Sequence, residues 1–270
     1  MFNAALFDGE QVLKPNDLTE VDTDVSSLIK FNGHAETIQK ILDVVKKTAY
    51  GIDFVLWGLE NQAKIHYAMP LRHMVGDAFS YLKEYNEIAA KNKKDGHFKS
   101  SDEFLSNMRK TDRLHPVYTI CLYSGTETWD GPRKLSDMME FRAETDPLKE
   151  YFSDYPANLF CVNEQREFEC FHTELRELLR AMNYRKDKRK FLSLEKDERY
   201  AHLSKETWEA IAIMTGRSFF EENMEIYKSQ NQNQREEYDM CQALREIRED
   251  FFNEGKAEGR AEGKAEGRAE

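Results

Sequence analysis

Two runs of hydrophobic residues near the N-terminus have the composition of paired strands. Residues 43–47 and 52–59 are rich in β-branched and aromatic side chains, and a tyrosine–glycine pair between them is typical of a tight turn. The run 52–59 is almost continuously apolar, as expected for a strand buried on both faces. We therefore predict a hairpin whose second strand is central in a sheet. Similar runs predict further strands at 117–123 and 159–162.

Helical spacing dominates elsewhere. A helix is expected from Met69-Pro70, because proline is tolerated in a first helical turn. The stripe predicted to be buried comprises Leu71, Met74, Val75, Ala78, Phe79, Leu82 and Tyr85. Further helices are expected over 168–183, 188–194, 205–215 and 221–253. The polar low-complexity stretch 230–235 could interrupt the last of them. The chain therefore divides into an α/β core (1–165), a helical region (166–253) and a polar tail (254–270).

The tail repeats Glu-Gly-(Lys/Arg)-Ala and has almost no apolar residue, which predicts a frayed helix or a flexible segment. The glycines cost about 1 kcal/mol each within a helix. We therefore predict that residues 254–270 are dispensable for folding.

Composition limits the classes of function. The 270 residues have a net charge of −11, 33% charged residues and a mean hydropathy of −0.76. No apolar run approaches the roughly 20 residues of a membrane span, and the first residues show no basic secretory signal, so a cytoplasmic protein is expected. The four cysteines lack zinc-ligand spacing and are expected to be free thiols.

An acidic protein binds DNA only through a local basic patch. Residues 185–190 are the best candidate, although such clusters are usually solvated helix faces.

Candidate chemistry is concentrated around the predicted hairpin. Glu60 and Gln62 follow the second strand and would project from the same face, and Asp43 of the first strand can reach that edge. Asp53 is the rival first acid, but its odd spacing from Glu60 puts it on the opposite face. Converging carboxylates suit Mg²⁺ or Mn²⁺, which polarises a scissile phosphate and activates water. This is the logic of PD-(D/E)XK nucleases. The motif alone is short, and the acids could equally be surface charges.

A longer pattern resembles the signature blocks of the Rpn/YhgA-like family of transposases and recombination-promoting nucleases. The stretch Leu59-Glu60-Asn61-Gln62 is followed by Met69-Pro70-Leu71-Arg72, which is similar to the family's "(I/L)ENQ … MP-x-R" block. Residues 2–23 resemble its opening, 42–46 its "RDxxK" strand, and 116–129 its "PVxxxVLYYGxxxW" block. The resemblance covers nearly the whole chain.

The resemblance implies a PD-(D/E)XK-like restriction-endonuclease core with a helical C-terminal region. It also implies a metal-dependent DNA endonuclease that hydrolyses phosphodiester bonds, linked to recombination or mobile elements. Asp43 and Glu60 would bind Mg²⁺ or Mn²⁺, and Gln62 would occupy the usual position of a catalytic lysine. Glutamine carries no charge, so it could orient water but not stabilise an anion. The expected partner is DNA. Homo-oligomers are an open option, and no association with a membrane is expected.

The alternative is a catalytically degenerate descendant of a mobile element that acts as a non-enzymatic interaction protein. In the family an acidic residue normally precedes the opening "FN", whereas this chain starts at Met1, which suggests a shortened N-terminus. Two residues near the motif have open roles. Arg72 could contact phosphate or pair with Asp77 or Glu60, and His66 could contact phosphate or cap the helix.

Overall fold

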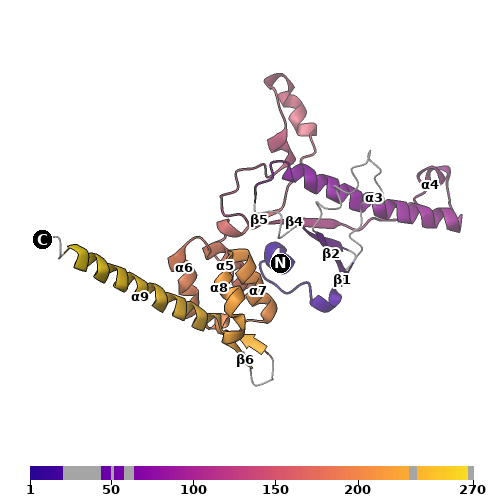
Figure 1. Cartoon of the computed structure of the whole chain (residues 1–270). Helices are drawn as coiled ribbons and strands as arrows, with labels where there is room; N and C mark the ends of the chain where they lie inside the picture. The colour runs from indigo at the N-terminus through magenta and orange to yellow at the C-terminus, as the bar shows by residue number, and fades with distance from the viewer. Residues whose placement is uncertain (21–43, 50–51, 58–63, 231–235, 267–270) are drawn as a thin grey trace, which may run out of the picture. The chain divides into compact units, whose positions relative to one another are not determined.

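The computed structural model describes residues 1–20, 44–49, 52–57, 64–230 and 236–266. They form two compact units, Phe2–Glu164 and Gln165–Glu270 (Figure 1), which are described separately below. In the described part of the chain, no helix combines the length and apolar character that crossing a membrane requires.

A five-stranded mixed sheet organises the N-terminal unit. Its order is β1-β2-β3-β4-β5, with the first two pairings antiparallel and the last two parallel. The central β3 pairs with β2 and with β4, so the predicted hairpin and central strand are confirmed, as is the α/β class. The strands are β1 (Thr19–Glu20), β2 (Val44–Ala49), β3 (Ile52–Trp57), β4 (Val117–Tyr123) and β5 (Leu159–Cys161).

Parallel β3 and β4 require a long connection, and helix α3 (Met69–Asp95) lies within it. Pro70 stands in its first turn as predicted. The helix ends at Gly96, which adopts a left-handed φ of 68° and donates its N–H to the carbonyl of Asn92. A left-handed C-terminal residue favours glycine, because it has no Cβ to clash.

The face that α3 buries differs from the prediction. Of the expected apolar stripe, Leu71, Val75, Ala78 and Leu82 are exposed, whereas His73 and Asp77 are buried. The Asp77 carboxylate accepts hydrogen bonds from the hydroxyls of Thr119 on β4 and of Tyr155 before β5. A buried carboxylate with two hydrogen-bond donors fixes the rotation of the helix about its axis. Hydrophobic periodicity in the sequence cannot reveal such a polar contact.

The remaining elements of this unit are short. They are α1 (Phe2–Leu6), α4 (Ser101–Ser106) and 3₁₀ turns at Pro15–Asp17, Leu135–Met138, Ala143–Tyr151 and Val162–Glu164. The Asn3 side chain ties the N-terminal segment to Leu13, donating to its carbonyl at 2.7 Å and accepting from its N–H at 2.9 Å.

The C-terminal unit is mainly helical and packs around Trp208. The indole Nε1 of this fully buried residue donates to the Phe220 carbonyl at 2.7 Å, and the indole stacks on Tyr227 with centroids 5.8 Å apart. The unit contains α5 (Leu175–Tyr184), α6 (Lys188–Ser193), α7 (Lys205–Thr215), α8 (Ser218–Asn223) and α9 (Met240–Glu266). Short 3₁₀ turns lie at Leu194–Lys196, Glu198–Ala201 and Met224–Tyr227.

The helix predicted over 221–253 is interrupted, near the polar stretch 230–235 where an interruption was considered. After α8, an antiparallel hairpin formed by β6 (Lys228–Gln230) and β7 (Glu236–Tyr238) separates it from α9. Lys228 Nζ and Glu236 Oε1 lie 2.8 Å apart across the hairpin, and the buried Tyr238 joins the core around Trp208. Helix α9 then continues into the repeat, because lysine, glutamate, arginine and alanine are good helix formers.

Candidate functional site

The predicted site residues Asp43, Glu60 and Gln62 lie outside the described residues. The nearest described positions are Val44, which opens β2, and Trp57, which closes β3, and these two are register partners. Trp57 is also the partner of Cys121 on β4. The chain therefore enters β2 and leaves β3 at one edge of the sheet.

The parallel strands β3, β4 and β5 all end at this same edge. In open α/β sheets, the carboxyl ends of parallel strands are the usual position of ligand sites. A buried cluster closes the edge, formed by Met69, Cys121, Tyr123, Trp129, Ala157 and Cys161. The Tyr123 and Trp129 rings meet edge to face, 5.0 Å apart. Burial raises the pKa of the Cys121 thiol to about 12 and that of Cys161 to about 11, so neither is a thiolate at neutral pH.

The first turns of α3 bring basic side chains to the same edge. Met69 packs in the edge cluster, and the half-buried Arg72 is close enough to Cys121 for their charges to interact. His73 is fully buried, and desolvation together with the neighbouring Arg72 lowers its pKa to about 4. His73 is therefore neutral at pH 7, and the positive charge at this position belongs to Arg72.

The structure favours the capping role for His66. Its Nδ1 accepts a hydrogen bond from the Ala68 N–H at 3.2 Å, just before α3 begins. The basic segment 185–190 lies at the surface of the C-terminal unit, where the Asp187 carboxylate accepts from the N–H groups of Arg189 and Lys190 and caps α6. This arrangement matches the solvated helix face considered from the sequence.

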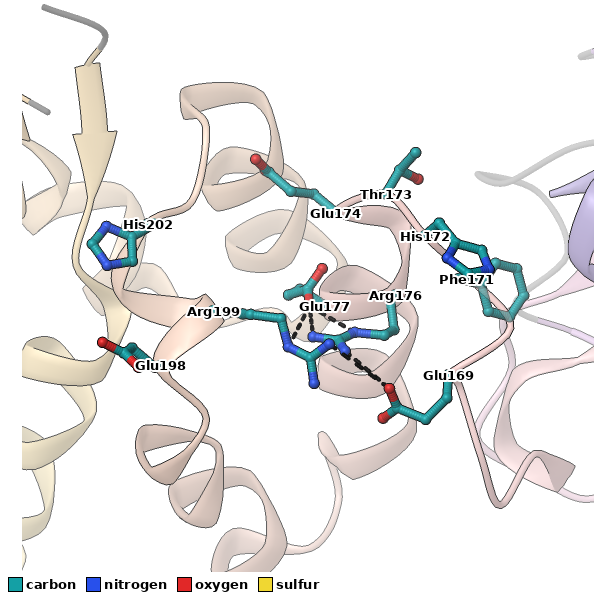
Figure 2. A pocket seen from close by; sticks show the side chains of 10 residues that line it. All are labelled: Glu169, Phe171, His172, Thr173, Glu174, Arg176, Glu177, Glu198, Arg199 and His202. Atoms are coloured by element: carbon teal, nitrogen blue, oxygen red, sulfur yellow. Dashed lines mark hydrogen bonds and ion pairs between the residues drawn. The ribbon is translucent and has the colours of Figure 1, made fainter. Parts of the chain in front are cut away.

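The C-terminal unit contains a pocket that the sequence did not indicate (Figure 2). Its volume is about 710 Å³, and it lies between the segment that leads into α5 and the turn before α7. Its lining is mostly charged or polar: Glu169, Phe171, His172, Thr173, Glu174, Arg176, Glu177, Glu198, Arg199 and His202.

A balanced ion network forms one wall of the pocket (Figure 2). Arg176 is only 3% exposed, and its Nε donates to the equally buried Glu177 at 2.8 Å while its Nη1 donates to Glu169 at 3.1 Å. Arg180 and Arg199 contact Asp197 at 3.0 and 3.1 Å. Each guanidinium thus faces at least one carboxylate, and the network offers little uncompensated positive charge to a phosphate. We interpret it as a structural element of the unit.

Periodicity could not have revealed this network. Arg176 and Glu177 are adjacent charged residues in a helix, and helical wheels normally place such residues in solvent. The available signal was weak: a dense alternation of arginines and acids over residues 166–199.

Within the described residues, no group of three or more histidine, cysteine, aspartate or glutamate side chains is arranged to hold a metal ion. No protein-family model, no curated protein and no solved structure matches this chain.

Proposed function

We propose that the chain is a metal-dependent DNA endonuclease that hydrolyses phosphodiester bonds in the cytoplasm, in connection with recombination or mobile elements. The observation that carries the proposal is the register of the sheet. Val44 pairs with Trp57, so the segments that lead to Asp43 and to Glu60 depart from one edge. The parallel strands end at that edge and α3 begins there. A PD-(D/E)XK-like core remains part of this proposal.

The residues suit Mg²⁺ or Mn²⁺ by the chemistry of their donor atoms. Asp43 and Glu60 would supply carboxylate oxygens, which hard divalent cations prefer. Bound Mg²⁺ would polarise the phosphate and lower the pKa of a water molecule. Gln62 would orient the attacking water through hydrogen bonds. Glutamine cannot supply the positive charge of a lysine. Arg72, half-buried beside the β4 edge, is the described residue best placed to do so.

The test is cleavage of supercoiled plasmid by the purified chain with Mg²⁺ or Mn²⁺ and with EDTA. Glu60→Ala and Asp43→Ala are expected to abolish nicking with an unchanged circular dichroism spectrum, and Gln62→Ala to reduce it less. Asp53→Ala distinguishes the rival acid, because it should retain activity if Asp43 is the ligand. Glu150→Ala, on an exposed 3₁₀ turn, is the matched control. Full activity of Glu60→Ala would place the chemistry elsewhere.

The second candidate is a non-enzymatic interaction protein that has lost the chemistry. The net charge of −11 and the glutamine at position 62 favour it, since both weaken phosphate binding. A folded parent chain that neither nicks DNA nor binds it in a filter assay at low salt, with either metal, would support this alternative.

A further inference from the structure

The outward face of the N-terminal half of α3 is apolar, and no element of the described residues covers it. Leu71, Val75 and Leu82 are 40%, 37% and 42% exposed, and Ala78 is exposed between them. Their spacing of four, three and four residues is that of the contact positions of a coiled coil. At about 100° per residue they lie roughly opposite the buried His73 and Asp77. Monomeric proteins rarely leave such a helical stripe uncovered.

The chain itself covers the continuation of this stripe. The next contact positions are Tyr85, Ala89 and Asn92, of which Ala89 and Asn92 are buried. The Tyr85 hydroxyl donates to the Ser106 carbonyl at 2.8 Å, and Asn92 Nδ2 donates to Asn107 at 3.1 Å and to Asp112 at 2.7 Å. Figure 1 shows α4 beside the C-terminal end of α3. Only the N-terminal half of the stripe is left without a covering element among the described residues.

We propose that this half, Leu71 to Leu82, packs antiparallel against the same helix of a second copy. The pattern 71-75-78-82 is symmetric about its midpoint, as an antiparallel two-fold contact requires. In the antiparallel pair Leu71 lies opposite the partner's Leu82, and Val75 lies opposite the partner's Ala78. The small Ala78, exposed on the stripe, allows close approach at the centre.

The flanking positions are compatible with this pairing. They are Arg72, Met74, Phe79 and Tyr81, and only one of them is charged. Arg72, the charged one, lies half-buried beside Cys121 and away from the contact, so no like charges meet across it. Antiparallel pairing therefore brings no like charges together at the centre of the contact.

The size of the stripe sets the expected affinity. Eleven residue steps span about 17 Å of helix. A contact of this length falls below the roughly 800 Å² per partner of standard interfaces. A dimer in the micromolar range that dissociates on dilution is therefore expected.

The first experiment is sedimentation velocity of the full chain from about 1 to 200 µM. The parent is expected to shift from monomer to dimer over this range. Leu82→Glu should raise the dissociation constant at least about tenfold, because it places a carboxylate in the contact. The controls Ala90→Glu, exposed on α3 but off the stripe, and Ile213→Glu, 65% exposed on α7, should leave it unchanged. A parent that stays monomeric, or equal effects in all three variants, would overturn the proposal.

The second experiment fixes the orientation and does not depend on how well Leu82→Glu folds. Cys121, Cys161 and Cys241 are buried, so Cys170→Ser removes the most accessible native thiol. In this background, an oxidised mixture of Leu71→Cys and Leu82→Cys chains should yield cross-linked heterodimer well above either chain alone. Predominant self-cross-linking of Leu71→Cys would indicate a parallel pair and contradict the antiparallel model. Slow alkylation of both cysteines in a monomer would show that the chain covers its own stripe.

Discussion

Removal of Arg176 tests the buried ion network most directly. Arg176 and Glu177 are 3% and 5% exposed and pair with each other. Arg176→Met therefore leaves the buried Glu177 carboxylate with only the long 3.8 Å contact to the exposed Arg199. Breaking such a pair from one side costs about 3–5 kcal/mol. This is a large share of the roughly 5–15 kcal/mol that stabilises a domain. For a unit of this size, the melting temperature should fall by at least about 12 °C.

The assay must separate the two units, since a single melting curve would average them. Hydrogen exchange in increasing urea, followed by mass spectrometry on peptides from α5 and α7, reports the C-terminal unit alone. Arg199→Met is the matched control: its side chain is 55% exposed, and it should cost less than about 1 kcal/mol. The double variant Arg176→Met/Glu177→Leu should recover most of the loss, because no buried charge remains. A loss below about 1 kcal/mol in Arg176→Met would refute the reasoning.

Further predictions concern the N-terminal unit and the tail. His73 has a pKa of about 4 in the folded chain, below its ordinary value of 6.5. Its contribution to the free energy of unfolding is therefore intact above pH 6.5 and is lost as the pH falls to 4. This decrease in the free energy of unfolding approaches about 3 kcal/mol. Urea titrations of His73→Gln at the same two pH values should not show it. Asp77→Ala leaves two hydroxyls without their acceptor and should cost about 1–3 kcal/mol, with Tyr155→Phe milder. Deletion of 254–270 should leave the melting temperature unchanged; a large drop would show that the tail docks.

The strands were predictable because their signal is local. The run 52–59 is apolar on both faces, and a strand with that pattern can only be central in a sheet. The structure places β3 there, between an antiparallel and a parallel neighbour. In β4 the residues from Thr119 to Tyr123 are all buried, in agreement with the apolar run. Here burial and composition carry the same information.

The orientation of α3 was not predictable from periodicity. Hydrophobic spacing assumes that the apolar face meets the core, but Asp77 binds two hydroxyls on elements that are 42 and 78 residues away in sequence. Such long-range polar contacts leave no trace in a local pattern. Within 221–253 the polar stretch 230–235 indicated only an interruption of the helix. The paired strands on either side of it escaped prediction, because charged strands that pair with each other resemble a polar helix.

The candidate site, too, was predictable only in part. Its acids were chosen from a motif, and the described strands show only that the segments leading to them leave one edge of the sheet. The sequence already suggested Arg72 as a phosphate contact, whereas its half-buried position beside Cys121 and the neutrality of His73 follow from burial and charge in the folded chain. Sequence can identify candidate ligands, but the protonation state of their neighbours depends on solvent access, which only a fold defines.

The two proposals about α3 can be tested separately because the helix has two faces. Arg72 lies near the sheet edge beside Cys121, whereas Leu82 lies on the outward face ten residues away, about 15 Å along the axis. Leu82→Glu therefore leaves the proposed phosphate contact in place, and nicking of one DNA strand by the monomer should persist. The two strands of a DNA duplex are antiparallel and hence related by two-fold symmetry. If a two-fold dimer of this chain acts on them, Leu82→Glu should convert double-strand breaks into nicks while the nicking rate is preserved. Loss of both products would instead mean that the outward face supports the site itself.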